Sequence, residues 1–102
     1  MVGVEGASVF AGQLQMNVVF DTTFENPLND PSAADPVKWT ARFEGMRYTG
    51  SSIFFIQWDT LFLVMDPTGA EAGADVLSYA NAPSDISDSL GRFLAAFAGF
   101  PL

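Results

Sequence analysis

Apolar and polar residues alternate along two stretches of the chain, which is the pattern of a β-strand with one buried and one solvated face. The apolar positions of the first stretch, residues 13–20, are Leu14, Met16, Val18 and Phe20. Those of the second stretch, residues 38–44, are Trp39, Ala41 and Phe43. We therefore predict a strand over each stretch, with Trp39 in the core and a proline-rich connection between the two strands.

Two later stretches, residues 53–56 and 61–65, are apolar at every position. Only four residues separate them, which predicts a β-hairpin. A strand with two apolar faces lies either at the centre of a fold or against another subunit. The chain also ends on an apolar segment, which we expect to be covered. These two features give the predicted interface residues Phe54, Ile56, Trp58, Phe62, Phe97, Phe100 and Leu102.

Turn-forming residues divide the rest of the chain into short segments. We predict breaks at 49–52 and 66–69, a short edge strand at 47–48, a strand at 76–80, a helical or tight turn at 84–91 and a last strand at 93–97. The strands then number about seven, with turns roughly every 8 to 12 residues. This spacing predicts an all-β fold, an immunoglobulin-like antiparallel sandwich of two sheets. A length of 102 residues fits a single domain over residues 1–102.

Three segments, taken in order, carry a likeness to a known family. They are Val18-Val19-Phe20-Asp21 followed by Asn26-Pro27-Leu28-Asn29, then Asp35-Pro36-Val37-Lys38-Trp39-Thr40, and then Leu77-Ser78-Tyr79 followed by residues 86–91 and 97–101. The chain resembles the bacterial immunoglobulin-like repeats of large surface and swimming-motility proteins, called SwmB-like domains. Arg92 departs from the family, which commonly has Asn after the preceding glycine. The resemblance implies a sandwich with an extracellular spacer or adhesive role and no enzymatic activity.

The charge balance excludes several classes of partner. Twelve acidic residues stand against four basic ones, so the net charge is −8, and the basic residues are scattered along the chain. A nucleic acid partner is therefore not expected, because binding phosphates requires clustered Lys or Arg. No apolar stretch has the length of a membrane span, so we expect no membrane insertion. Histidine and cysteine are both absent, which removes the commonest general base and metal ligand and any thiol chemistry, and we predict a non-enzyme without a cofactor.

Four acidic residues in two predicted loops are weak calcium candidates: Asp30 and Asp35 in one loop, Asp85 and Asp88 in the other. Calcium needs six to eight oxygen ligands, and the spacing of an EF-hand loop is absent. Turn formation and helix capping explain these residues without a metal. Trp58 lies at a predicted hairpin bend, where an exposed aromatic ring would suit a sugar. A carbohydrate- or calcium-binding module is therefore kept as an alternative.

The expected setting follows from the absence of a secretion signal. The chain starts at Met1 without the basic and apolar regions of a signal peptide, whereas domains of this kind usually occur in exported proteins. A phage particle would resolve this conflict, because it is assembled in the host cytosol and released by lysis. We predict a virion protein, a capsid decoration or tail or fibre component, which acts with protein partners in an oligomeric assembly. The alternative is an immunoglobulin-like module excised from a secreted bacterial adhesin of the cell surface.

Overall fold

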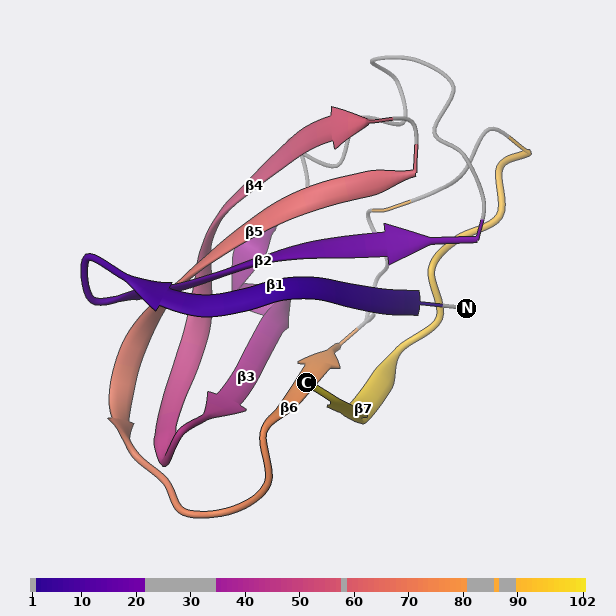
Figure 1. The fold of residues 1–102 in the computed structure, drawn as a ribbon. Helices are drawn as coiled ribbons and strands as arrows, with labels where there is room; N and C mark the ends of the chain where they lie inside the picture. The colour runs from indigo at the N-terminus through magenta and orange to yellow at the C-terminus, as the bar shows by residue number, and fades with distance from the viewer. Residues whose placement is uncertain (1, 22–34, 58, 81–85, 87–89) are drawn as a thin grey trace.

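The structure is a computed structural model that describes residues 2–21, 35–57, 59–80, 86 and 90–102. Seven β-strands are found among them (Figure 1). They are β1 (Val2–Phe10), β2 (Gln13–Phe20), β3 (Trp39–Phe43), β4 (Met46–Gln57), β5 (Thr60–Ala70), β6 (Val76–Tyr79) and β7 (Phe97–Pro101). A short 3-10 helix, η3 (Pro36–Lys38), leads into β3. The all-β prediction is thus confirmed for the described part of the chain.

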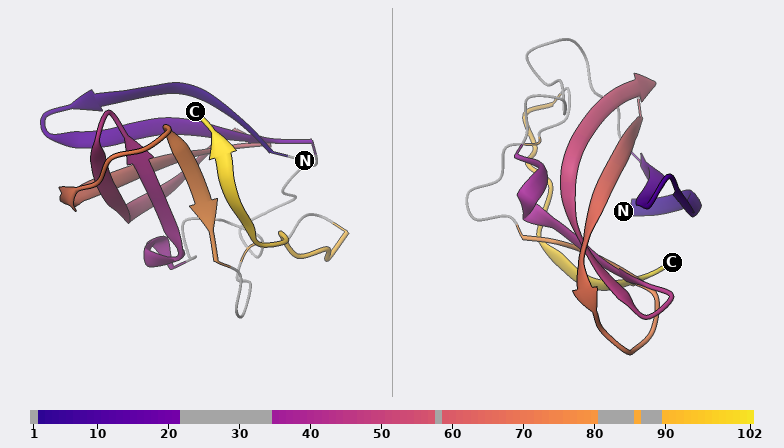
Figure 2. Two further views of the ribbon diagram at one scale, coloured as in Figure 1. Left: turned by 90° about the horizontal axis from the view of Figure 1, so that it is seen from below. Right: turned by 90° about the vertical axis from the view of Figure 1, so that its left-hand side faces the viewer.

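All seven strands belong to one antiparallel sheet, in the order β1-β2-β5-β4-β3-β6-β7. The predicted division into two sheets is not confirmed, because a ladder of backbone pairs links each strand to the next. Figure 2 shows how the sheet curls instead, so that β7 at one edge bends round toward β1 at the other. Irregularities in the pairing of β4 with β5 assist this curl, since a β-bulge bends its strand and increases the local twist.

The core lies on the inner side of the curl and receives side chains from both ends of the sheet. Strand β2 alternates strictly between buried and partly exposed residues, as the sequence predicts. Its register with β5 places Met16 opposite Leu63, and both are buried. The buried apolar cluster comprises Leu14, Met16, Val18, Phe20, Trp39, Ala41, Tyr48, Ile53, Leu61, Leu63, Met65, Leu77, Tyr79 and Ile86.

Aromatic rings join the last three strands of the sheet order. Trp39 of β3 is fully buried, and its ring centroid lies 4.6 Å from that of Tyr79 on β6. Phe97 of β7 contacts both rings, at 5.9 Å from Trp39 and 6.2 Å from Tyr79. Phe100 continues the series at 6.2 Å from Phe97. The prediction that Trp39 is a core residue is confirmed.

Strands β4 and β5 are longer than the sequence predicts, because both continue through the expected breaks. In β4 the strand passes through Gly50, where a Cβ atom would lie 2.1 Å from the carbonyl oxygen of Pro36. The glycine is there because η3 crosses close to the strand, not because the strand ends. In β5 the strand passes through Pro67, which pairs with Tyr48 next to a shift in register. Proline is tolerated at such a bulge, where a ladder hydrogen bond is already missing.

The two edge strands also differ from the prediction. The sequence does not predict strand β1, because Gly3 and Gly6 disfavour a strand and an irregularity between Glu5 and Ser8 breaks the alternation of apolar and polar residues. The last strand begins at Phe97, so the predicted strand 93–97 is wrong except at its last residue; residues 94–96 are not in a strand and only an isolated bridge is found at Phe93. The later position pairs Tyr79 with Phe97 and brings the ring of Phe97 onto the core. Most of the predicted turn at 84–91 lies outside the described residues.

A tight hairpin sets the register of β3 and β4. Glu44 and Gly45 both have positive φ, at 50° and 77°, as in the two-residue turns that match the twist of paired strands. The backbone N–H of Glu44 also donates to Asp75 Oδ1 at 2.9 Å. The turn places Phe43 opposite Met46 and Arg42 opposite Arg47.

Candidate interaction surface

The outer face of β4 and β5 carries large apolar side chains. Phe54 and Phe62 are direct partners across the two strands, while their neighbours Ile53 and Leu63 are buried on the inner side. The two rings are tilted by 32° with their centroids 6.4 Å apart. Phe54 is 51% exposed, and Phe62 is partly buried beside it. The paired rings therefore form an apolar platform on the side of the sheet that faces away from the core.

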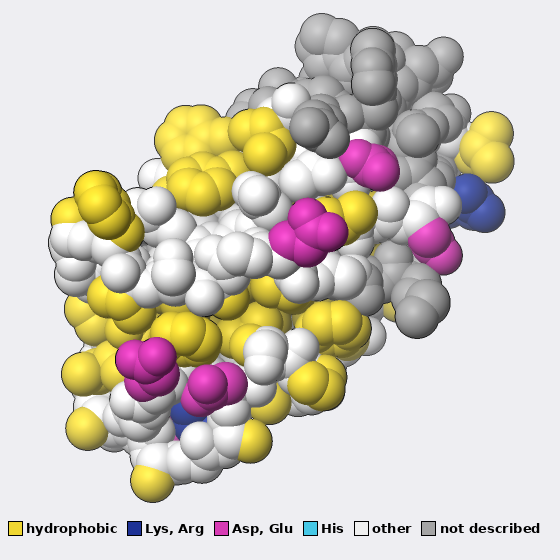
Figure 3. Space-filling model, viewed as in Figure 1, with side chains coloured by type: hydrophobic (Ala, Val, Ile, Leu, Met, Phe, Trp, Pro, Cys, Tyr) yellow, Lys and Arg dark blue, Asp and Glu magenta, His cyan; other side chains and the backbone are white. Residues whose placement is uncertain are grey.

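Ile56 extends this platform along β4 and is 49% exposed. We call Phe54, Ile56 and Phe62 together the β4–β5 apolar face. Figure 3 shows apolar side chains gathered over these two strands. Toward β2 the surface becomes polar, since Phe62 pairs with Asn17. The platform is thus an apolar area with a polar residue next to it on the side of β2, and exposed apolar areas of this kind are found at interaction sites.

The remaining predicted interface residues lie elsewhere or outside the described part. Trp58 lies outside the described residues. Phe97, Phe100 and Leu102 are partly buried and pack against the chain's own core, so the C-terminal segment already has an apolar partner within the molecule. The backbone N–H of Leu102 donates to the carbonyl oxygen of Asp75 at 3.0 Å, which holds the end of the chain in place.

A second exposed apolar site is missed by the sequence reasoning. Val9 and Phe10 are 44% and 69% exposed at the end of β1, beside the turn formed by Ala11 and Gly12. In Figure 1 this turn projects at the left end of the molecule. The sequence shows only a Val-Phe pair directly before Ala-Gly. Because no strand is predicted there, the sequence does not place these two side chains at the end of a hairpin.

The structure gives Asp35 a local role. Its Oδ1 accepts a hydrogen bond from the backbone N–H of Val37 at 3.1 Å and so caps η3. Asp30, Asp85 and Asp88 lie outside the described residues. Among the residues that the structure places, no group of three acidic side chains could hold a metal ion. In the same part of the chain, no helix is long and apolar enough to cross a membrane.

No protein-family model matches the chain, and comparisons with curated proteins and with solved structures found no match. A proposal for its function therefore depends on the surface and the chemistry of this chain alone.

Proposed function

We propose that the protein is a non-enzymatic interaction module that binds protein partners through the β4–β5 apolar face. The observation that supports this most is the pair Phe54 and Ile56, two large apolar side chains that are about half exposed on neighbouring outward positions of one strand. They do not complete the chain's own core, because the inner side of the same strands is already filled by residues such as Ile53 and Leu63.

Burial of these side chains would supply the free energy of association. Removing apolar surface from water contributes about 25 cal/mol per Å². Aromatic residues at the centre of an interface commonly dominate its affinity, and polar residues around them exclude water. The paired rings of Phe54 and Phe62 are already in contact, so they lose little conformational freedom when a partner covers them.

The exposed tip of the β1–β2 hairpin supports assembly over simple pairing. Phe10 lies at the end of the sheet and belongs to a different strand pair from Phe54. A module with two separated apolar sites is able to contact two neighbours. This is the arrangement that a structural component of a larger particle needs.

The proposed setting is a phage particle, in which the module acts as a capsid decoration or as a tail or fibre component. The alternative is an adhesive or spacer domain at the bacterial surface, as the resemblance to immunoglobulin-like repeats implies. Cosedimentation with isolated capsids and tails, compared with cosedimentation with whole bacterial cells, distinguishes the two settings.

The decisive experiment is to measure association of the variant Phe54→Ser by light scattering after size exclusion and by cosedimentation with particles. We expect the unaltered protein to self-associate or to bind particles, and the variant to lose at least tenfold in affinity. Phe93→Ser is the matched control, because Phe93 is 66% exposed but lies outside the β4–β5 apolar face. A monomer that binds neither particles nor cells, or equal losses in both variants, would contradict the proposal.

A further inference from the structure

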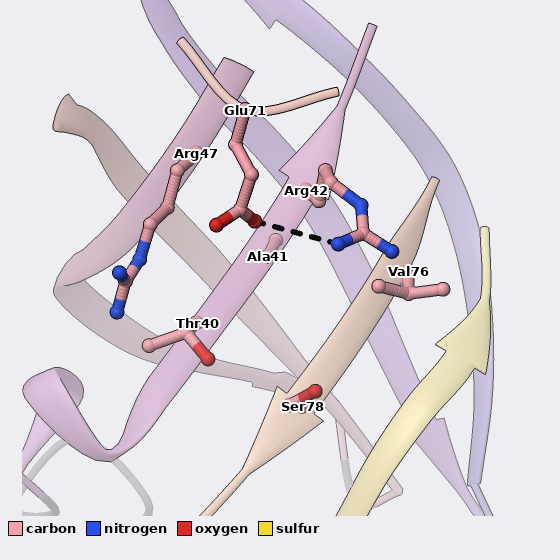
Figure 4. Close-up of a pocket in the computed structure, with 7 residues that line it drawn as sticks. All are labelled: Thr40, Ala41, Arg42, Arg47, Glu71, Val76 and Ser78. Carbon is pink, nitrogen blue, oxygen red and sulfur yellow. Dashed lines mark hydrogen bonds and ion pairs between the residues drawn. The ribbon is translucent and has the colours of Figure 1, made fainter. Parts of the chain in front are cut away.

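The outer face of β3, β4 and β6 carries a polar hollow of about 290 Å³ (Figure 4). We call it the basic hollow. Its main lining residues are Thr40 and Arg42 of β3, Arg47 of β4, Glu71, and Val76 and Ser78 of β6. Two of the four basic residues of a chain with net charge −8 therefore meet in one depression.

The two arginines stand directly opposite each other on neighbouring strands. Like charges in this position destabilise a sheet, so this pair of arginines lowers the stability of the folded protein. Twelve acidic residues are present in the chain, yet only one acidic side chain, Glu71, lines the hollow among the described residues. An anion bound between the arginines would remove the repulsion.

Arg42 is held in place by the segment that follows β5. Its Nε donates to the carbonyl oxygen of Ala74 at 2.8 Å, and its Nη1 lies 3.5 Å from Glu71 Oε2. The backbone of Gly73 lies against the guanidinium, since a Cβ atom there would be 2.5 Å from Arg42 Cζ. One arginine of the pair is thus fixed and partly neutralised.

Arg47 has no hydrogen-bond or ion-pair partner for its guanidinium among the described residues. In Figure 4 it extends away from Glu71 on the side of Thr40. The planar group therefore offers its donors to the hollow, in the fork geometry that matches a carboxylate. Because Glu71 offsets the charge of one arginine, one net positive charge is left, which suits a monoanion better than a phosphate dianion.

Two hydroxyl groups complete the donor set. Thr40 and Ser78 are direct partners across β3 and β6, and both line the basic hollow. Ser78 Oγ already accepts from the backbone N–H of Gly99 at 3.1 Å, which leaves the hydroxyl hydrogen free to donate. A carboxylate in the hollow could therefore receive hydrogen bonds from a guanidinium and from a hydroxyl.

A second hollow of about 410 Å³ meets the first at Thr40 and Ser78. Its lining is mainly apolar and includes Val37, Ala96 and Ala98, with Lys38 as a third basic residue on this face. We propose that the two hollows together bind an amphipathic carboxylic acid, with its carboxylate at Arg47 and its apolar part over Val37 and the alanines. The site is separate from the β4–β5 apolar face and does not depend on the function proposed above.

The test is an NMR titration of the ¹⁵N-labelled full chain with sodium hexanoate, with sodium chloride at equal ionic strength as the reference. We expect saturable shifts of the backbone amides of Thr40, Arg47 and Ser78. Arg47→Gln should weaken binding at least tenfold, whereas Arg92→Gln, outside both hollows, should leave it unchanged. Glu71→Gln should tighten binding severalfold by removing the competing charge. Shifts that chloride reproduces, or binding that Arg47→Gln leaves unchanged, would overturn the proposal.

A chain-length series tests the second hollow. From acetate to butyrate to hexanoate, affinity should rise about twofold for each added methylene, half of the fourfold that full burial gives. Equal affinities would overturn the assignment of the apolar part. N-acetyl-Gly-Leu with a free carboxyl group then distinguishes the sources of the ligand. Tighter binding than hexanoate indicates the C-terminus of a protein, and weaker binding indicates a free acid; the corresponding amide should not bind.

Discussion

The outer face of the sheet is built in two different ways. Over the last part of β4 and the paired part of β5 it presents apolar side chains: Phe54 and Ile56 are about half exposed, and Phe62 is partly buried beside Phe54. Over β3, β6 and the first residues of β4 it presents Arg42, Arg47 and hydroxyl groups around a hollow.

Both regions have the same support, because the inner side chains of all four strands join one apolar core. The comparison indicates that the core sets the fold, while the outward positions are free to provide two unlike surfaces. Substitutions inside should therefore affect both surfaces, and substitutions outside should affect only one.

The largest effect is expected from Trp39→Ala, which should remove both surfaces by unfolding the sheet. Trp39 is fully buried, and its loss leaves Tyr79 and Phe97 without their common partner. We expect a loss of about 3–5 kcal/mol in the free energy of unfolding, measured by urea denaturation. Phe54→Ala, at an exposed ring, should cost less than half as much. Similar losses in the two variants would show that the outer face also belongs to the core.

A smaller effect is expected from Gly50→Ala, at the crossing that connects the two regions. The new methyl group would meet the backbone of Pro36, whose oxygen and carbonyl carbon lie 2.1 and 2.9 Å from the Cβ position. Because backbone cannot rotate away, η3 must shift, at a cost of about 1–3 kcal/mol. Gly3→Ala is the matched control in β1, since its nearest contact is an ordinary 3.9 Å. Equal melting temperatures for the two variants would contradict the close crossing.

Gly73→Ala should affect the basic hollow alone. The substitution pushes against the guanidinium of Arg42, so hexanoate binding should weaken about threefold to tenfold while association through the β4–β5 apolar face is unchanged. Gly69→Ala is the control, because Gly69 has nearly the same φ, 148° against 142°, but open space around its Cβ position. A change common to both variants would reflect backbone strain and not the position of Arg42.

Several of the residues discussed above are placed correctly from the sequence. The alternating burial along β2 and the core position of Trp39 follow from the local sequence. Every second side chain of a strand lies on the same face, so the apolar positions identify the buried face. The unbroken apolar run in β4 likewise predicts a second apolar face on that strand, and Phe54 and Ile56 lie there.

The wrong predictions of strand ends have a different cause, because these ends depend on contacts with segments that are distant in the sequence. Gly50 and Pro67 are normally turn formers, and only the approach of η3 and a bulge against Tyr48 explain why the strands continue through them. Pairing across the sheet also decides that β7 begins at Phe97. The basic hollow cannot be predicted from the sequence for the same reason: Arg42 and Arg47 lie opposite each other only because the hairpin at Glu44 and Gly45 pairs β3 with β4.

The smallest effect is expected from Arg47→Gln in the absence of any ligand, and it should have an unusual sign. Removing one member of the opposed arginine pair should raise the free energy of unfolding by about 0.2–0.5 kcal/mol at low salt. The gain should disappear near 1 M salt, where charges are screened within about 3 Å. Denaturation at two salt concentrations, with Arg92→Gln as the control, measures it. A loss of stability at low salt would mean that the Arg47 guanidinium has a stabilising partner within the chain. A gain would indicate that the two arginines still repel each other in the free protein, although Glu71 partly neutralises Arg42.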